Sequence, residues 1–408
     1  MLSKSTVVMF PVVILLYAWW KRGKISRSDL KSSASFFAVS LGLGLVTVVF
    51  EHHRSMSGVT SVPAGNLVSR LAEAGVALVF YFSKCAVPHN LSLIYPARPT
   101  SPLRPIPCWL LLAAVFVWFW TKRTTWGRHA LFGLGFFALN LLPVLGIVPI
   151  AYQDISPVAD HFTYLSLIGL IALAVGTFGI LLRKSEKSLR IALELVATAA
   201  IALLAITTHG YAKVFSNAES LWAYAARKNP ESWVPENNLG LVLADAGRRA
   251  ESIAHFERAL QIKPDAAEVE ANLGLALAGS DRLPEAIAHY ERALQLNPDF
   301  PEGSNNLGLA LARTDRTAEA IASLEQAIRL RPDYPEAHRN LGLVLARAGR
   351  MADAIAELET AIRLNPDYAE AHNNLALIFR AVGRDREAAE QFEEGARLKA
   401  ERTPTLSP

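Results

Sequence analysis

The sequence contains very little cysteine. Cys85 and Cys108 are its only two cysteines, and both lie in the amino-terminal half. Disulfide frameworks and zinc clusters need several cysteines or histidines at set spacings, so neither stabilises the carboxy-terminal half. The sequence also lacks a phosphate-binding glycine loop, a zinc-protease motif and a nucleophile elbow. These absences argue against the common classes of soluble enzyme, and no ligand spacing indicates a metal.

Acidic residues are scarce in the first half. Up to Gly210 there are 18 Lys and Arg against 7 Asp and Glu, whereas from Tyr211 onward the counts are 23 and 30. The basic excess lies in short segments between apolar runs, as in the loops that flank membrane helices. We therefore expect no nucleic-acid partner.

Long apolar runs dominate this first half. Six of them can span a bilayer once interfacial residues complete them: 7–20, 36–50, 106–120, 130–150, 162–182 and 191–207. A seventh run, 74–82, is shorter and is flanked by Glu73 and Lys84, so we predict an interfacial or re-entrant helix. Residues 1–210 are therefore predicted to form a polytopic membrane domain surrounded by membrane lipid.

The cations predict which way the domain faces. With six spans, twelve Lys and Arg residues after the first, third and fifth spans share one side, and four lie opposite. The positive-inside rule makes the richer side cytoplasmic, so the carboxy-terminal half is predicted to be extracytoplasmic on a multi-pass protein of the cell inner membrane. The first helix would then enter from outside, like an internal span. We therefore expect the chain to begin partway through a longer ancestral domain.

A 34-residue unit recurs five times between 233 and 402. Aligned on its NLGL-type segment, each unit has a small residue at the same place. These are Gly240, Gly274, Gly308, Gly342 and Ala376. Further small residues recur twelve and nineteen positions later, and Pro264, Pro298, Pro332 and Pro366 recur after each second helix, which proline cannot continue. This period and pattern are those of the tetratricopeptide repeat (TPR), a stack of helical hairpins.

The repeat register extends upstream of the first full unit. Pro230, Ala225 and Trp222 lie 34 residues before Pro264, Ala259 and Phe256. We therefore predict a capping helix over 217–228 within a 211–232 linker, and a disordered polar tail over 403–408. The predicted fold is all-α: a polytopic transmembrane helical domain followed by a TPR α-solenoid.

Asparagine occupies the sixth position of every repeat. The five residues are Asn238, Asn272, Asn306, Asn340 and Asn374. Stacked repeats would align these amides, which donate and accept hydrogen bonds and so suit a peptide backbone. The alternative is that they bond adjacent hairpins to each other. Three positions on, Leu241, Leu275, Leu309, Leu343 and Leu377 form an apolar stripe or pack between repeats. The predicted partner is an extended polypeptide or a partner protein.

Two polar clusters are predicted at the outer membrane face. Glu51, His52, His53 and Arg54 follow the second span, and Asp154, Asp160, His161 and Tyr164 lie between the fourth and fifth. Together they could form a pocket for a lipid phosphate and an acceptor hydroxyl, with an acid as general base. The alternative is that polar residues simply collect where a helix leaves lipid.

These segments carry a family resemblance. The stretches that contain "VVFEHHRS", "RLAEAGVALVFYFSKCAVPHNLSLIYP" and "AYQDISPVADHFTYL", followed by TPRs, resemble bacterial relatives of the transmembrane-and-TPR protein O-mannosyltransferases. Those polytopic GT-C enzymes transfer a sugar from a polyprenyl-phosphate donor to Ser or Thr hydroxyls outside the cytoplasm. The resemblance implies that Asp160 and His161 line the donor or acceptor pocket.

This chain departs from the family at its amino terminus. The family's catalytic acidic residues lie in the first extracytoplasmic loop, and this sequence begins after that point, so no catalytic residue is assigned. We expect glycosyltransferase ancestry, with sugar transfer dependent on a missing amino-terminal part and with no cofactor beyond the polyprenyl-phosphate sugar donor. The alternative function is a non-enzymatic membrane-tethered TPR scaffold for protein interaction.

Overall fold

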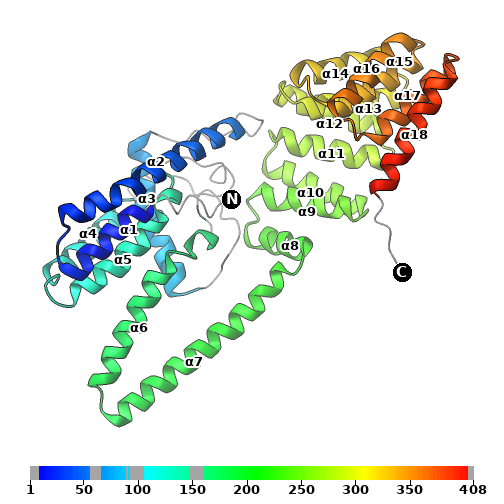
Figure 1. The fold of residues 1–408 in the computed structure, drawn as a ribbon. Helices are drawn as coiled ribbons and strands as arrows, with labels where there is room; N and C mark the ends of the chain where they lie inside the picture. The colour runs from blue at the N-terminus through cyan, green and yellow to red at the C-terminus, as the bar shows by residue number, and fades with distance from the viewer. Residues whose placement is uncertain are drawn as a thin grey trace, which may run out of the picture. The chain divides into compact units, whose positions relative to one another are not determined.

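The chain is helical in every regular element that the structure describes. The structure is a computed structural model that describes residues 9–55, 66–88, 91, 105–147, 158 and 160–402, without the side chains of 43–55, 160 and 161. Two compact units are formed, Met1–Pro235 and Glu236–Pro408, and their boundary falls inside α9 (Trp233–Asp245). The predicted all-α fold is thereby confirmed for the described residues (Figure 1).

The first unit is built from eight α-helices and short 3-10 turns among its described residues. The α-helices are α1 (Phe10–Arg22), α2 (Arg27–Ser55), α3 (Leu67–Ala86), α4 (Pro105–Thr121), α5 (Gly127–Leu141), α6 (Leu167–Lys184), α7 (Lys187–Ala212) and α8 (Ala218–Lys228). The 3-10 turns are η3 (Leu142–Val144), η5 (Asp160–Thr163) and η6 (Lys213–Phe215). Helix α8 covers the segment predicted as a capping helix.

Local signals explain where α1 ends and α2 begins. Gly23 adopts a left-handed φ of 74° after α1, a conformation that costs glycine little. The Ser26 backbone N–H and hydroxyl then donate to the Asp29 carboxylate at 2.8 and 2.6 Å, while the Asp29 N–H donates back to the Ser26 hydroxyl. This reciprocal pair starts α2. Its hydrogen bonds, with the nearby Arg22 guanidinium, lower the pKa of Asp29 to about 2.

The core of the first unit forms around α3. Ala74, Ala77 and Tyr81 are buried in one cluster with Phe137 and Leu141 of α5. The cluster is completed by Val144, Leu145, Val158 and Phe162. The run 74–82, predicted as interfacial or re-entrant, is thus the middle of a continuous 20-residue helix whose small-residue face packs inward. Where this helix lies relative to a bilayer stays a prediction.

Close helix contacts in the first unit depend on glycine. A Cβ on Gly75 would lie 2.5 Å from the Trp109 ring of α4, and the Trp109 indole N–H lies 3.2 Å from the Leu71 carbonyl. Gly133 of α5 faces Gly169 of α6 so closely that a Cβ would lie 2.9 Å from the Gly169 carbonyl oxygen. Small residues let helix backbones approach in this way in membrane bundles.

Two helices are long and apolar enough to cross a bilayer, counting only the part of the chain that the structure describes. They are α6 and the continuous stretch Lys187–Phe215 that contains α7; α4 is apolar but shorter. No residue of α7 is buried. The other four predicted spans overlap α1, α2, α4 and α5, and their membrane placement stays a prediction.

The second unit is a stack of helical hairpins, which begin with α9. The remaining helices are α10 (Arg249–Ile262), α11 (Ala267–Gly279), α12 (Leu283–Leu296), α13 (Pro301–Arg313), α14 (Thr317–Leu330), α15 (Pro335–Arg347), α16 (Met351–Leu364), α17 (Ala369–Ala381) and α18 (Asp385–Arg402). First and second helices alternate along the stack (Figure 1). The predicted TPR solenoid is confirmed.

Small residues hold the two helices of each hairpin close together. A Cβ on Gly308 would lie 2.6 Å from the Leu324 side chain, and one on Gly274 would lie 2.8 Å from the Tyr290 ring. Ala293, Ala327 and Ala361 on the second helices have no exposed surface. Near the end of each first helix, the core also contains the buried residues Leu243, Leu277, Leu311, Leu345 and Phe379. The recurring small residues of the alignment therefore lie where the two helices of a hairpin approach most closely.

The turn inside each hairpin has a residue with a left-handed backbone conformation at the same repeat position. Positive φ angles of 75°, 61°, 60°, 78° and 80° occur at Gly247, Asp281, Asp315, Gly349 and Gly383, one every 34 residues. Glycine adopts this conformation at little cost, and aspartate is among the few other residues that tolerate it. The tight turn therefore persists in the two repeats that lack glycine there.

Candidate functional site

A groove crosses the first helices of three successive repeats. We call it the inner groove; its cavity is about 350 Å³, and α11, α13 and α15 provide most of its lining. Its side chains of interest are Leu275, Leu309, Leu343, Asn306, Asn340, Arg313 and Arg347. The asparagines and leucines are those that the sequence placed on one helix face. Stacking repeats in register brings them together.

The leucine stripe faces the groove. Leu275 is 55 % exposed and Leu377 is 48 % exposed, while Leu309 and Leu343 are partly buried in the groove wall. Buried packing between hairpins belongs instead to the residues two positions on, such as Leu277. Of the two roles open from the sequence, the apolar stripe is the one that the structure supports at 275, 309 and 343.

The asparagine ladder alternates along the stack. The Asn272 amide donates to the Asn237 side-chain oxygen at 2.9 Å, and the Asn340 amide donates to that of Asn305 at 2.8 Å. Both bonds join one repeat to the next, and Asn340 is buried. At these two positions the asparagine therefore has the role of bonding adjacent hairpins.

The amides of Asn306 and Asn374 lack such a partner in the preceding repeat. The position of the acceptor, held by Asn237 and Asn305 in the bonded pairs, is occupied by Ala271 for Asn306 and by Arg339 for Asn374. Neither of these side chains can accept a hydrogen bond. Asn306 lines the inner groove, where its side-chain oxygen accepts from Asn305 at 3.3 Å. Asn306 is thus the ladder residue best placed to meet a peptide in the groove.

Two arginines at equivalent positions complete the groove. Arg313 and Arg347 end α13 and α15, 34 residues apart. Arg313 donates to the Ala278 carbonyl and to the Asp281 carboxylate, both at 3.0 Å. Among the residues that the structure describes, the Arg347 guanidinium makes no hydrogen bond or ion pair. The groove therefore combines an apolar floor, the two amides of Asn306 and Asn340, and two cations.

A polar pair links the two helices of most hairpins, and the sequence analysis missed it. His255 of α10 lies 2.6 Å from the Glu236 carboxylate of α9, and His289 lies 2.6 Å from Glu270. In the fourth repeat the order is reversed, because His338 is on the first helix and Glu357 on the second, again 2.6 Å apart. The partners are always 19 residues apart in the sequence.

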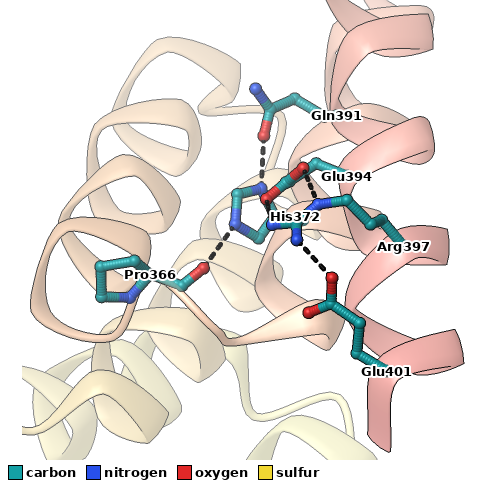
Figure 2. A network of polar contacts seen from close by, with 6 residues as sticks. All are labelled: Pro366, His372, Gln391, Glu394, Arg397 and Glu401. Carbon is teal, nitrogen blue, oxygen red and sulfur yellow. Dashed lines mark hydrogen bonds and ion pairs between the residues drawn. The ribbon is translucent and has the colours of Figure 1, made fainter.

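The fifth repeat keeps the reversed order with a neutral partner. Figure 2 shows His372 between the Gln391 side-chain oxygen, 2.7 Å from Nδ1, and the Pro366 carbonyl oxygen, 3.1 Å from Nε2. The same view shows Arg397 bridging Glu394 and Glu401 on α18. The third repeat has serines instead, and the Ser304 hydroxyl is buried without a hydrogen bond.

His338 has an acceptor at both ring nitrogens. Its Nδ1 faces the Glu357 carboxylate, and its Nε2 lies 3.1 Å from the Pro332 carbonyl oxygen. A neutral imidazole has only one N–H, so both bonds form only with the imidazolium. The hydrogen bond to Glu357 accordingly raises the pKa of His338, although partial burial opposes the shift. The sequence contained a signal for this pair. The same two repeat positions, 19 residues apart, hold Glu and His in the first two repeats and His and Glu in the fourth.

The structure does not bring the predicted membrane-face residues into a described site. Glu51, His52, His53 and Arg54 lie in the last turns of α2, and Asp160 and His161 lie in η5, but their side chains are outside the described residues. Asp154 also falls outside them. Tyr164 is 74 % exposed. Within the described ranges no group of three or more His, Cys, Asp or Glu could hold a metal ion.

Comparison with known proteins identifies the repeats. Tetratricopeptide repeat models match residues 234–299, 271–335 and 305–359, and a TPR repeat model matches 345–383. The carboxy-terminal half is a TPR solenoid. Such repeats serve as scaffolds for protein interaction, with their stacked helices forming extended binding surfaces. No curated protein matches the chain.

Solved TPR structures are similar to part of this chain. "Crystal structure of MamA" is 24 % identical, covers 40 % of this chain and 95 % of its own, and has a TM-score of 0.37. "Crystal structure of YrrB: a TPR protein with an unusual peptide-binding site" is 22 % identical with 45 % and 95 % coverage and the same TM-score. MamA from Desulfovibrio magneticus RS-1 is 20 % identical, with 42 % and 96 % coverage and a TM-score of 0.38.

Proposed function

We propose that this chain is a membrane-anchored TPR protein that holds extended polypeptide in its inner groove on the extracytoplasmic side. The observation that carries the proposal is the groove itself. Leu309 and Leu343 offer apolar contact to side chains of the segment, and the Asn306 amide can both donate to and accept from a peptide backbone. An extended segment fits such a lining because its own backbone groups are unpaired.

The exposed surface of α7 supports membrane anchoring. Leu195, Val196, Ile201, Leu203 and Ile206 are each more than 60 % exposed, and no residue of the helix is buried. Apolar surface of this extent, on a stretch of 29 residues, is stable in a bilayer core and unfavourable in water. Lipid is therefore the surrounding that this helix fits.

The aromatic residues at one end of the first unit support the proposed sidedness. Trp19 of α1 stacks on Trp120 of α4 with ring centroids 6.0 Å apart, so these two helices end side by side. The Arg123 guanidinium lies 4.9 Å from the Trp120 ring, and Lys21 lies 5.1 Å from Trp20. With six spans, the first and third predicted spans, α1 and α4, both end on the cytoplasmic side. Their neighbouring ends, surrounded by Lys and Arg, agree with that arrangement.

Peptide capture tests the groove. Fluorescence polarisation of labelled unstructured peptides with the full-length chain in detergent should show weaker binding for Leu309→Ser and Asn306→Ala, by about 10-fold for the leucine because a central apolar contact is lost. Asn272→Ala is the matched control, because that amide already bonds Asn237; we expect it to lower stability and leave affinity unchanged. Unchanged affinity for Leu309→Ser would refute the proposal.

Protease accessibility tests the sidedness. A protease added to intact spheroplasts should digest the repeats, and the same protease added to inverted vesicles should leave them intact. The reverse pattern would place the repeats in the cytoplasm and remove the extracytoplasmic part of the proposal.

We also propose, from the sequence resemblance, descent of the membrane unit from GT-C protein O-glycosyltransferases. One observation favours it: Val158 and Phe162, from the stretch that carries the resemblance, are buried in the core cluster with Tyr81 and Phe137. That packing would hold the backbone of Asp160 and His161 at a defined place. Transfer of radiolabelled sugar from a polyprenyl phosphate to a Ser/Thr peptide tests this, and activity equal in wild type and Asp160→Asn would exclude a role for Asp160.

A further inference from the structure

We propose that the inner groove selects extended polypeptide segments that carry two acidic side chains about three residues apart, and that Arg313 and Arg347 bind these two carboxylates. This inference rests on the proposed function and adds the chemical class of the partner. The occupant is an extended segment of another protein in which two apolar residues separate the two acidic ones.

The charge of the groove carries the inference. Its lining residues include two arginines and no Asp or Glu. The chain from Tyr211 onward is acidic as a whole, with 30 acidic against 23 basic residues, so the groove is cationic on an anionic body. An acidic segment is repelled by the surroundings and attracted only where the arginines lie. Such a local contrast confers specificity and register more than bulk affinity.

The two arginines occur only in the middle of the stack. Their repeat position is occupied by Asp245 and Gly279 in the first two repeats and by Ala381 in the last. The cations therefore belong to two of the three repeats that line the groove, and the same position is not basic in the other three repeats. A role in the turn geometry common to all repeats would require the same side chain in each of them.

The ion pair between Asp281 and Arg313 is an example of a carboxylate bound at the groove. Its Oδ1 atom lies 3.0 Å from an Arg313 Nη atom, and its side chain is 85 % exposed. An ion pair exposed to this extent contributes little to stability, so a carboxylate of the partner can replace it at small cost. Arg347, which makes no polar contact among the described residues, is open to a second carboxylate. Arginine binds carboxylates through two parallel N–H donors.

The spacing of the acidic residues follows from the stack. Neighbouring packed helices lie about 8–10 Å apart, and an extended segment in the polyproline II conformation advances about 3.1 Å per residue with three residues per turn. One repeat therefore corresponds to about three residues of the bound segment. Because i and i+3 share one face of such a segment, carboxylates at these two positions would meet Arg313 and Arg347, and the residues between them would reach the leucine stripe.

The experiment uses the full-length chain in detergent and three labelled peptides of one apolar sequence. One carries Asp at i and i+3, one carries Asn at both, and one carries Asp at i and i+1. The first peptide should bind about 10-fold more tightly than the second, because two exposed ion pairs each contribute modestly, and it should also bind more tightly than the third. Its preference should shrink as salt increases.

Variants assign the preference to the arginines. Arg347→Gln should bring the Asp peptide to within about 3-fold of the Asn peptide, and Arg313→Gln with Arg347→Gln should abolish the preference, since each removes a charged donor. Asp281→Asn should bind the Asp peptide a few-fold more tightly, because it removes the competing carboxylate. All three side chains are exposed, and an unchanged melting temperature serves as the folding control.

The outcomes separate this inference from the proposed function. Equal binding of all three peptides, with both Asp and Asn peptides still lost in Leu309→Ser, would overturn the acidic preference and leave the groove as a peptide site. An Asp preference that survives the double arginine variant would overturn the assignment. Binding that is absent, or unaffected by Leu309→Ser, would overturn the proposed function and this inference with it.

Discussion

Helices α7 and α14 are both rich in alanine, yet their surroundings are opposite. In α14, Ala320 and Ala327 have no exposed surface, whereas α7 has no buried residue. In α14 small residues recur seven positions apart beside Glu, Gln and Arg, so one narrow face packs and the other is hydrated. In α7 apolar residues surround the helix. The comparison shows that apolar content alone does not identify a buried helix face.

Glycine substitutions give the largest expected contrast between the two units. Gly308→Ala would place a Cβ 2.6 Å from Leu324, so we expect a loss of about 1–3 kcal/mol from overpacking. Gly176→Ala in α6 has nothing within 4 Å of its Cβ and should be neutral or stabilising. Hydrogen exchange resolved by peptide measures both. Equal losses would mean that α6 is packed as tightly as the repeats.

Substitutions in the pair of His338 and Glu357 are expected to have the next largest effect on stability. His338→Glu alone faces Glu357 across the hairpin with a like charge in a buried position, and should cost about 2 kcal/mol. Adding Glu357→His recreates the order found in the first two repeats and should recover most of the loss. Urea denaturation measures the coupling. A double variant no better than the single would show that each order suits only its own repeat.

Ser252→Ala should stabilise the repeat unit by about 1 kcal/mol, because it removes a buried hydroxyl that has no hydrogen-bond partner. The four later repeats have alanine at this position, so the smaller side chain fits. Ser323→Ala in α14 is the control, because that serine is only partly buried and its replacement should change little. Thermal denaturation compares the two variants. A loss of stability in Ser252→Ala would indicate that the hydroxyl is hydrogen-bonded in solution.

The smallest expected effect is a pH dependence of repeat stability. The pKa of His338 is raised in the folded chain by its hydrogen bond to Glu357. Its contribution is therefore complete below the ordinary histidine pKa of about 6.5 and is lost as pH rises through the higher folded value. Glu357→Gln should flatten the fall in melting temperature above about pH 6.5. An unchanged profile would mean that this pair does not govern the dependence.

Much of the repeat unit could be predicted from residues that recur every 34 positions. The glycine row at 240 to 342 and the proline row at 264 to 366 predicted the helical hairpins and the ends of their second helices. The leucine stripe was predicted with two possible roles, and its exposure at Leu275 decided between them. The alternation of the asparagines was missed, because it depends on the residue one position earlier in the preceding repeat.

The sequence by itself determined that the second half is a TPR solenoid, because each small, apolar or helix-breaking residue acts within its own hairpin and the same local rule is repeated. Only the tertiary structure decided which equivalent residues differ in role. Asn340 bonds Asn305 while Asn306 faces the groove, and Arg313 and Arg347 share one lining. Those roles depend on distances between neighbouring repeats, and a distance across a packed interface is set by every side chain in it.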